Sequence, residues 1–111
     1  MAKGDQRAHD LYKGFEDYYS FHGVLDGSGE AEIEFDFPAA SVSVENASAA
    51  DMWVVFGDAD NEVIPTDDGT TDTTNKMVRV PVAGVRAMDK RTTVVRIAGA
   101  VAGAYHVIGL I

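Results

Sequence analysis

The sequence has no cysteine, few basic residues and no long apolar run, and each of these absences excludes a class of protein. Without cysteine the chain has neither a disulfide framework nor a thiolate that could act as nucleophile or metal ligand. Nine Lys and Arg residues stand against 18 Asp and Glu residues, a net charge of −9. Because phosphate contacts need clustered basic side chains, this balance argues against nucleic-acid binding.

The apolar segments are too short to cross a membrane. Residues 97–111, IAGAVAGAYHVIGLI, carry no Asp, Glu, Lys or Arg. They fall short of the roughly twenty residues that a spanning helix needs. The polar start, MAKGDQRAHDLYKG, lacks the apolar stretch of a secretory signal. We therefore expect no membrane association, and we expect residues 97–111 to include a core strand.

A two-residue period runs through much of the chain. A length of 111 residues with 46% hydrophobic residues suits one domain with a real core. In GEAEIEFDFP the residues Ala31, Ile33, Phe35 and Phe37 alternate with acids, which predicts a half-buried strand that Pro38 ends. A slip by one residue would turn the apolar set outward, so Ile33 and Phe35 should be buried and Glu32 and Glu34 exposed.

Other segments repeat the strand pattern. SVSVE alternates, NASAAD supplies a turn, and MWVVF is an apolar run typical of a strand covered on both faces, which favours a core position for Trp53. KMVRVPV, TTVVRIA and YHVIGLI are further strands. Six or seven short strands with Gly, Asn and Asp turns predict an all-β fold, an antiparallel β-sandwich or a small jelly-roll-like barrel, over residues 24–111.

Residues 1–23 differ from the rest and are expected to form an N-terminal arm. The segment could begin with a short helix and continue as an extended arm or edge strand. Half of the aromatic residues of the chain lie here. They either cover an open end of their own sandwich or anchor on a neighbouring subunit. The candidate interface residues are Tyr12, Phe15, Tyr18 and Tyr19.

The acid-rich segment GDADNEVIPTDDGTTD, residues 57–72, raises the question of calcium. An EF-hand loop counted from Asp58 would have Val63 where glycine is needed and Gly69 where a bidentate Glu is needed, so that interpretation fails. The composition favours a solvated loop without a metal. An irregular calcium site is the alternative, and its candidate ligands are Asp58, Asp60, Asp67, Asp68 and Asp72.

No catalytic motif stands out, and we expect no enzyme activity and no cofactor. The three histidines, His9, His22 and His106, show no ligand-type spacing, and His106 lies in an apolar strand where a hydrogen-bonded structural role is expected. A Ser-His-Asp arrangement could only be assembled in space, because no nucleophile elbow is present. Carboxylates that alternate along residues 30–36 are typical of a solvated strand face.

Two stretches carry a resemblance to a known family. SVSVENASAADMWVVFGDAD and KMVRVPVAGVRAMDKRTTVVRIAGA, within residues 38–100, resemble the small β-rich accessory proteins of tailed bacteriophage particles; VPVAG at residues 80–84 is similar to their turn before a β-branched strand. The resemblance implies a virion protein, non-enzymatic, that decorates or cements a capsid or sits on the portal or tail. Its partners would be the major capsid protein or a portal or tail protein, and we expect a homo-oligomer. A carbohydrate- or surface-binding module, with or without calcium, is the alternative function.

Overall fold

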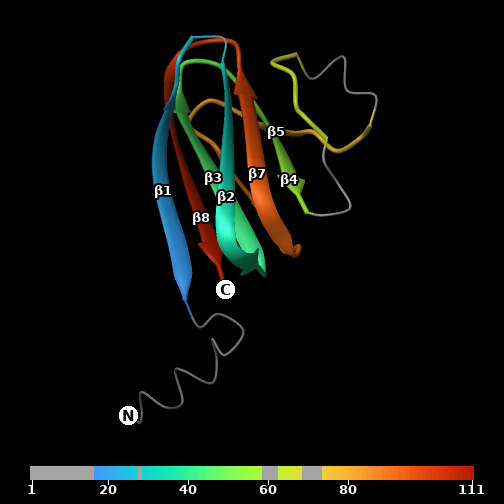
Figure 1. Ribbon diagram of the computed structural model, residues 1–111. Helices are drawn as coiled ribbons and strands as arrows, with labels where there is room; N and C mark the ends of the chain where they lie inside the picture. The colour runs from blue at the N-terminus through green and yellow to red at the C-terminus, as the bar shows by residue number, and fades with distance from the viewer. Residues whose placement is uncertain (1–16, 28, 59–62, 69–73) are drawn as a thin grey trace.

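The computed structural model describes residues 17–27, 29–58, 63–68 and 74–111, and in these residues the fold is all-β. Two four-stranded antiparallel sheets pack face to face (Figure 1). Sheet A has the strand order β1-β8-β3-β6 and sheet B the order β2-β7-β4-β5. The strands are β1 (Tyr18–Leu25), β2 (Glu30–Ala39), β3 (Ser41–Ser48), β4 (Met52–Gly57), β5 (Val78–Val80), β6 (Val85–Met88), β7 (Thr92–Gly99) and β8 (Gly103–Leu110).

The pairing of the strands is nested. β1 pairs with β8, β2 with β7, β3 with β6 and β4 with β5, all antiparallel. The pairs β3–β8 and β4–β7 then join these ribbons into the two sheets. A long hairpin wound in this way is a jelly roll. The expected all-β fold is confirmed, and of the two forms considered the antiparallel sandwich is the one adopted. No helix in the described residues is long and apolar enough to cross a membrane.

Alternate residues of both sheets form the core between them. Buried aliphatic side chains dominate, and Val54, Val95, Ile97 and Val107 have no exposed surface. β4 is buried along most of its length, as its continuous apolar run predicts. Trp53 is half-buried instead of lying in the core, because it alternates with Met52 and Val54 and so points to the outer side of sheet B.

Strand β2 follows its predicted pattern at first and then departs from it. Ile33 is buried while Glu32 and Glu34 are exposed, as expected. Phe35 is partly buried, with its ring 5.5 Å from that of Tyr19. The prediction that Phe37 faces the core was wrong, since it is 62% exposed. The register between β2 and β7 shifts between Glu34 and Ala39, and such an irregularity breaks the two-residue period.

Strand β2 also continues past Pro38. β2 includes Pro38 and ends at Ala39, whereas the sequence predicted that proline would end it. Proline is compatible with a strand at the edge of a sheet, where its missing N–H removes no ladder bond, and β2 is an edge strand of sheet B.

The segment NASAAD is only in part a turn. Asn46 to Ser48 belong to β3, and the chain turns between Ser48 and Met52. The Asn46 side chain points inward and is fully buried. Its Nδ2 donates to the carbonyl oxygens of Ala50 (2.8 Å) and Val80 (2.9 Å), and its Oδ1 accepts from the Ser48 N–H (2.8 Å). This amide therefore connects β3 of sheet A to β5 of sheet B.

The first described strand lies within the segment that the sequence assigned to the arm. Residues 18–23 are part of β1, which pairs with β8 from Tyr18–Leu110 to Leu25–Gly103 and forms an edge of sheet A. The sequence left open whether this part of the segment is an extended arm or an edge strand, and residues 18–23 form an edge strand. The helix considered near the start of the chain lies outside the described residues.

Candidate interaction surface

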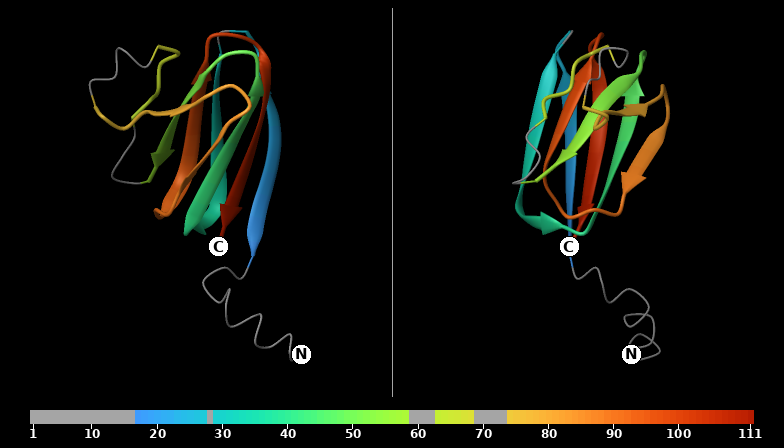
Figure 2. Two further views of the ribbon diagram at one scale, coloured as in Figure 1. Left: turned by 180° about the vertical axis from the view of Figure 1, so that it is seen from behind. Right: turned by 90° about the vertical axis from the view of Figure 1, so that its right-hand side faces the viewer.

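The outward side of sheet B is charged and partly covered by the chain itself. Glu30, Glu32 and Glu34 of β2 point outward, and Arg96 of β7 lies opposite Glu32. Val55 of β4 also faces this side, yet it has no exposed surface. The described parts of the connection from β4 to β5, residues 63–68 and 74–77, lie beside this sheet, away from β1 and β8 (Figure 2). Sheet B therefore offers neighbours a row of glutamates, with Phe37 and Ile64 as exposed apolar side chains beside it.

The outward side of sheet A, in contrast, carries almost no charged side chains. Cross-strand partners share a face, so the outward set follows from the register of β1, β8, β3 and β6. We call these positions the neutral face, because Glu45 is the one Asp, Glu, Lys or Arg side chain among them. They are Tyr18, Ser20, His22, Val24, Ser43, Glu45, Ala47, Val85, Ala87, Ala104, His106, Ile108 and Leu110.

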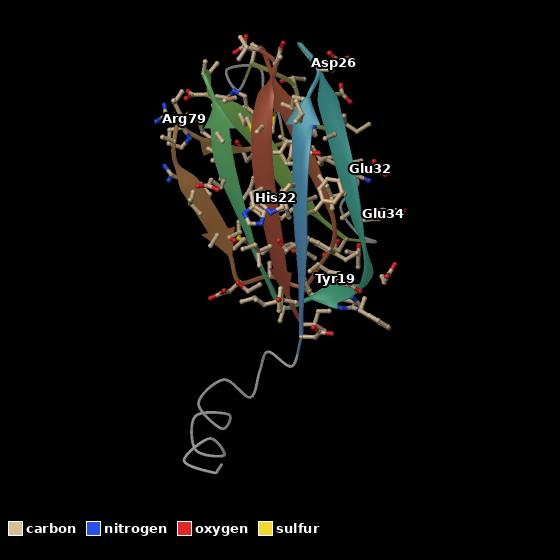
Figure 3. The ribbon with its side chains drawn as sticks, turned by 90° about the vertical axis from the view of Figure 1, so that its left-hand side faces the viewer. Tyr19, His22, Asp26, Glu32, Glu34 and Arg79 are labelled. Atoms are coloured by element: carbon tan, nitrogen blue, oxygen red, sulfur yellow. The ribbon has the colours of Figure 1, made fainter. Side chains whose placement is uncertain are left out.

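A polar cluster lies within the neutral face. His22 of β1 and His106 of β8 are direct partners, and their rings stack with centroids 3.8 Å apart and planes 13° apart. Ser20 Oγ lies 2.8 Å from His106 Nε2, and Glu45 Oε1 of β3 lies 4.0 Å from His106 Nδ1. In Figure 3 His22 lies near the middle of this side, whereas Glu32, Glu34 and Arg79 lie toward its margins.

Ser20, His106 and Glu45 are the residue types of a hydrolytic triad, but their arrangement lacks its essential contacts. A triad needs the acid hydrogen-bonded to Nδ1, and 4.0 Å exceeds hydrogen-bond length. Ser20 is exposed on an open sheet face, and the cavity over sheet B described below lies on other elements. His106 is hydrogen-bonded, as predicted.

Sequence reasoning missed this cluster because its members are far apart in the chain. Ser20 and His106 are 86 positions apart, and no spacing rule connects them. The pairing of β1 with β8 and of β8 with β3 brings His22, His106 and Glu45 into one row. From the sequence alone, the polar residues of the cluster could be recognised only as outward-facing positions on separate strands. The register of β1, β8 and β3 was needed to show that they are neighbours.

The predicted interface residues divide into three cases. Tyr12 and Phe15 lie outside the described residues. Tyr18 is 65% exposed at the start of β1, on the neutral face. Tyr19 points the other way and stacks on Phe35 within its own sandwich. Tyr18 is therefore available to a neighbour, whereas Tyr19 serves the chain's own packing.

The acid-rich segment gives no cluster of metal ligands in its described part. Asp58 forms an ion pair with Lys90 at 2.7 Å, and Asp67 and Asp68 are exposed. Asp60 and Asp72 lie outside the described residues. In the arrangement that the described residues adopt here, no three or more His, Asp or Glu side chains lie close enough together to hold a metal ion.

A cavity of about 220 Å³ lies on the outward side of sheet B. Glu30, Glu32 and Arg96 line it from the sheet, and Ile64 and Pro65 line it from the β4–β5 connection. Arg96 Nε donates to Glu32 Oε1 at 3.2 Å, while its Nη1 is buried without a hydrogen-bond partner in the described part of the chain. The cavity thus combines carboxylates, a guanidinium and an apolar wall.

Comparison with known proteins supports the fold and does not extend to function. No family model and no curated protein matches the chain. Among solved structures it is similar to PirA, with a TM-score of 0.50 and 17% identity over 84% of this chain and 94% of that chain. It is also similar to a chain of Bacillus endospore appendages, a family of disulfide-linked pili, with a TM-score of 0.49 and 14% identity over 86% of each chain. Neither is a phage decoration protein, so the resemblance to phage accessory proteins stays a prediction.

Proposed function

We propose that this chain is a non-enzymatic structural subunit of a bacteriophage particle, which decorates or cements the capsid or is attached to the portal or tail. In this proposal copies of the chain contact each other through the neutral face. The observation that carries the proposal is the near absence of charge on one side of the domain, in a chain whose net charge is −9.

Charge explains why this face suits a second copy of the same chain. Two copies that approach through sheet B would place Glu30, Glu32 and Glu34 of one against acids of the other. Like charges brought together at an interface are destabilising by several kcal/mol. Approach through the neutral face brings together Ile108, Tyr18 and small side chains instead, and the core of a protein interface is typically depleted of charge.

The size of the face is sufficient for a specific contact. The width of the face is four strands spaced about 4.8 Å apart, and its length is about eight residues with a rise of about 3.4 Å each. The product is a surface of roughly 500 Å². Two such faces would together bury about 1,000 Å², which is the lower limit for a biological interface. A symmetric dimer of this kind would be weak alone and would depend on further contacts in a larger assembly.

A matched pair of substitutions tests the contact between copies. Ile108→Asp places a charge on the neutral face, and Ile64→Asp places the same charge on an exposed position near sheet B. Sedimentation velocity and native mass spectrometry should show that Ile108→Asp reduces self-association while Ile64→Asp leaves it unchanged. Equal masses for both variants and the wild type over the same concentration range would reject the neutral face as the contact.

The role in a particle needs a separate test. Particles purified from a lysate of the producing host should contain the chain in a fixed ratio to the major capsid protein, measured by quantitative mass spectrometry after density-gradient separation. A chain that stays at the top of the gradient, or whose ratio varies between preparations, would contradict the particle role and leave the self-association result unaffected.

A second candidate function rests on the cavity over sheet B. Carboxylates accept hydrogen bonds from hydroxyl groups, a guanidinium donates them, and Ile64 with Pro65 supplies an apolar wall, a combination that suits a carbohydrate. A glycan array that shows binding by the wild type and none by Arg96→Met, with Arg79→Met as the control on β5, would favour this function. No binding to any glycan would remove it.

A further inference from the structure

The two stacked histidines have properties that assembly does not explain. His22 and His106 come from adjacent strands at directly opposite positions. Residues placed in this way have Cβ atoms about 4.5–5.5 Å apart. The His22 imidazole is exposed, so the core does not block rotation about its side-chain bonds, whereas His106 is partly buried and bonded to Ser20. The pair therefore provides two nitrogen donors on a rigid scaffold, with freedom only in the rings.

The hydrogen bond from Ser20 influences which nitrogen of His106 is available. When Nε2 carries the proton and donates it to Ser20 Oγ at 2.8 Å, Nδ1 keeps a free lone pair. Nδ1 is also the nitrogen that faces Glu45, with 4.0 Å between Nδ1 and Oε1. A hydrogen-bonded partner on the second nitrogen is the usual way in which a metal-binding histidine is oriented.

We propose that His22 and His106 chelate a divalent transition-metal ion, with the Glu45 carboxylate as third ligand and water in the remaining positions. Imidazole nitrogen and carboxylate oxygen bind such ions at about 2.0–2.2 Å. Two nitrogens at that distance from one tetrahedral ion are about 3.4 Å apart, a separation that opposite positions on adjacent strands can reach by rotation of the His22 ring while Ser20 holds His106 in place. The 4.0 Å gap between His106 and Glu45 closes by a small shift of the exposed carboxylate.

The surroundings favour a cation. The neutral face has no Lys or Arg side chain, and the whole chain is acidic. No group of three or more ligand side chains lies within metal distance in the residues described here, so rearrangement of the rings is part of binding. A site with two imidazoles prefers copper, nickel and zinc to the hard ions calcium and magnesium, with copper bound most tightly. This preference separates it from the acid-rich loop, which could offer oxygen ligands only.

Titration of the full chain with zinc chloride by isothermal calorimetry, in a buffer that does not bind metal, tests the proposal. We expect one ion per chain in the wild type. His22→Asn and His106→Asn should each weaken binding by about tenfold or more, and Glu45→Gln by a smaller factor. The matched control is His9→Asn, which changes the third histidine of the chain and should leave the affinity unchanged.

Two further measurements keep the result interpretable if a variant is unstable. Zinc should raise the thermal unfolding temperature of the wild type and not that of His22→Asn, since an ion that binds only the folded state stabilises it. With copper, electron paramagnetic resonance should show two imidazole nitrogens in the wild type and one in either single variant. Wild-type affinity in both His22→Asn and His106→Asn, or loss of binding in His9→Asn alone, would overturn the proposal.

Discussion

Replacement of Asn46 by alanine should destabilise the fold more than any surface substitution on the same strand. The side chain has no exposed surface and makes hydrogen bonds that connect β3, the β3–β4 turn and β5. Its Oδ1 also accepts from Ser48, both from the backbone N–H and from Oγ at 2.6 Å. Alanine removes all of these contacts and fills little of the space.

The magnitude follows from the groups left without a partner. The Val80 carbonyl and the Ser48 N–H lose a buried hydrogen bond, whereas Ser48 Oγ keeps its bond to Ala50 O at 2.8 Å. A buried polar group left unsatisfied costs about 1–3 kcal/mol, so two such groups and a small cavity cost about 3–5 kcal/mol. This is a large share of the roughly 5–15 kcal/mol that stabilises a domain.

Urea unfolding followed by the fluorescence of Trp53 measures this loss. With a slope near 1.5 kcal/mol per M, the midpoint of Asn46→Ala should fall by roughly 2–3 M. Ser43→Ala, an outward position on the same strand, is the control and should shift the midpoint little. If Asn46→Ala shifted the midpoint no more than Ser43→Ala does, the amide would not connect the sheets in the way described.

Four further outcomes are expected. Gly23→Ala should lower the thermal unfolding temperature, because an added Cβ would overlap the ring of Tyr105, and a larger drop than in Ala104→Ser would be the sign of that clash. Burial raises the pKa of Tyr105 above 10.0 in the folded state. The stability that the protonated side chain contributes is therefore complete below pH 10 and is lost as the pH rises through the pKa of the folded state. Urea titrations between pH 9 and 12 should show a smaller loss of stability in Tyr105→Phe than in the wild type. Calorimetric titration with calcium should show no binding tighter than micromolar at residues 57–75. A chain without residues 1–16 should keep a cooperative melt and lose its place in the particle, whereas co-sedimentation of that folded chain would exclude the arm as the attachment.

The sequence alone determined six of the eight strands and, for most of their length, which of their faces is apolar, whereas β6 was not predicted and β1 was one of two alternatives for its segment. Alternation is a local property, because successive side chains of a strand point to opposite sides, and it placed Ile33 inside and Glu32 and Glu34 outside. The apolar run at β4 likewise indicated a strand covered on both faces, and β4 is buried along most of its length. The acidic composition, also readable without a structure, argued against nucleic acid as a partner.

Only the tertiary structure decided which strands are neighbours, and the candidate sites depend on that. The shift in register along β2 exposed Phe37 against its local pattern, and the packing of β3 against β5 turned Asn46 from a turn residue into a buried connector. The stacking of His22 on His106 depends on β1 and β8, the first and last strands in chain order, which pair in the nested order of the jelly roll. Contacts between residues so distant in the chain are set by the packing of whole sheets, and no local propensity encodes them.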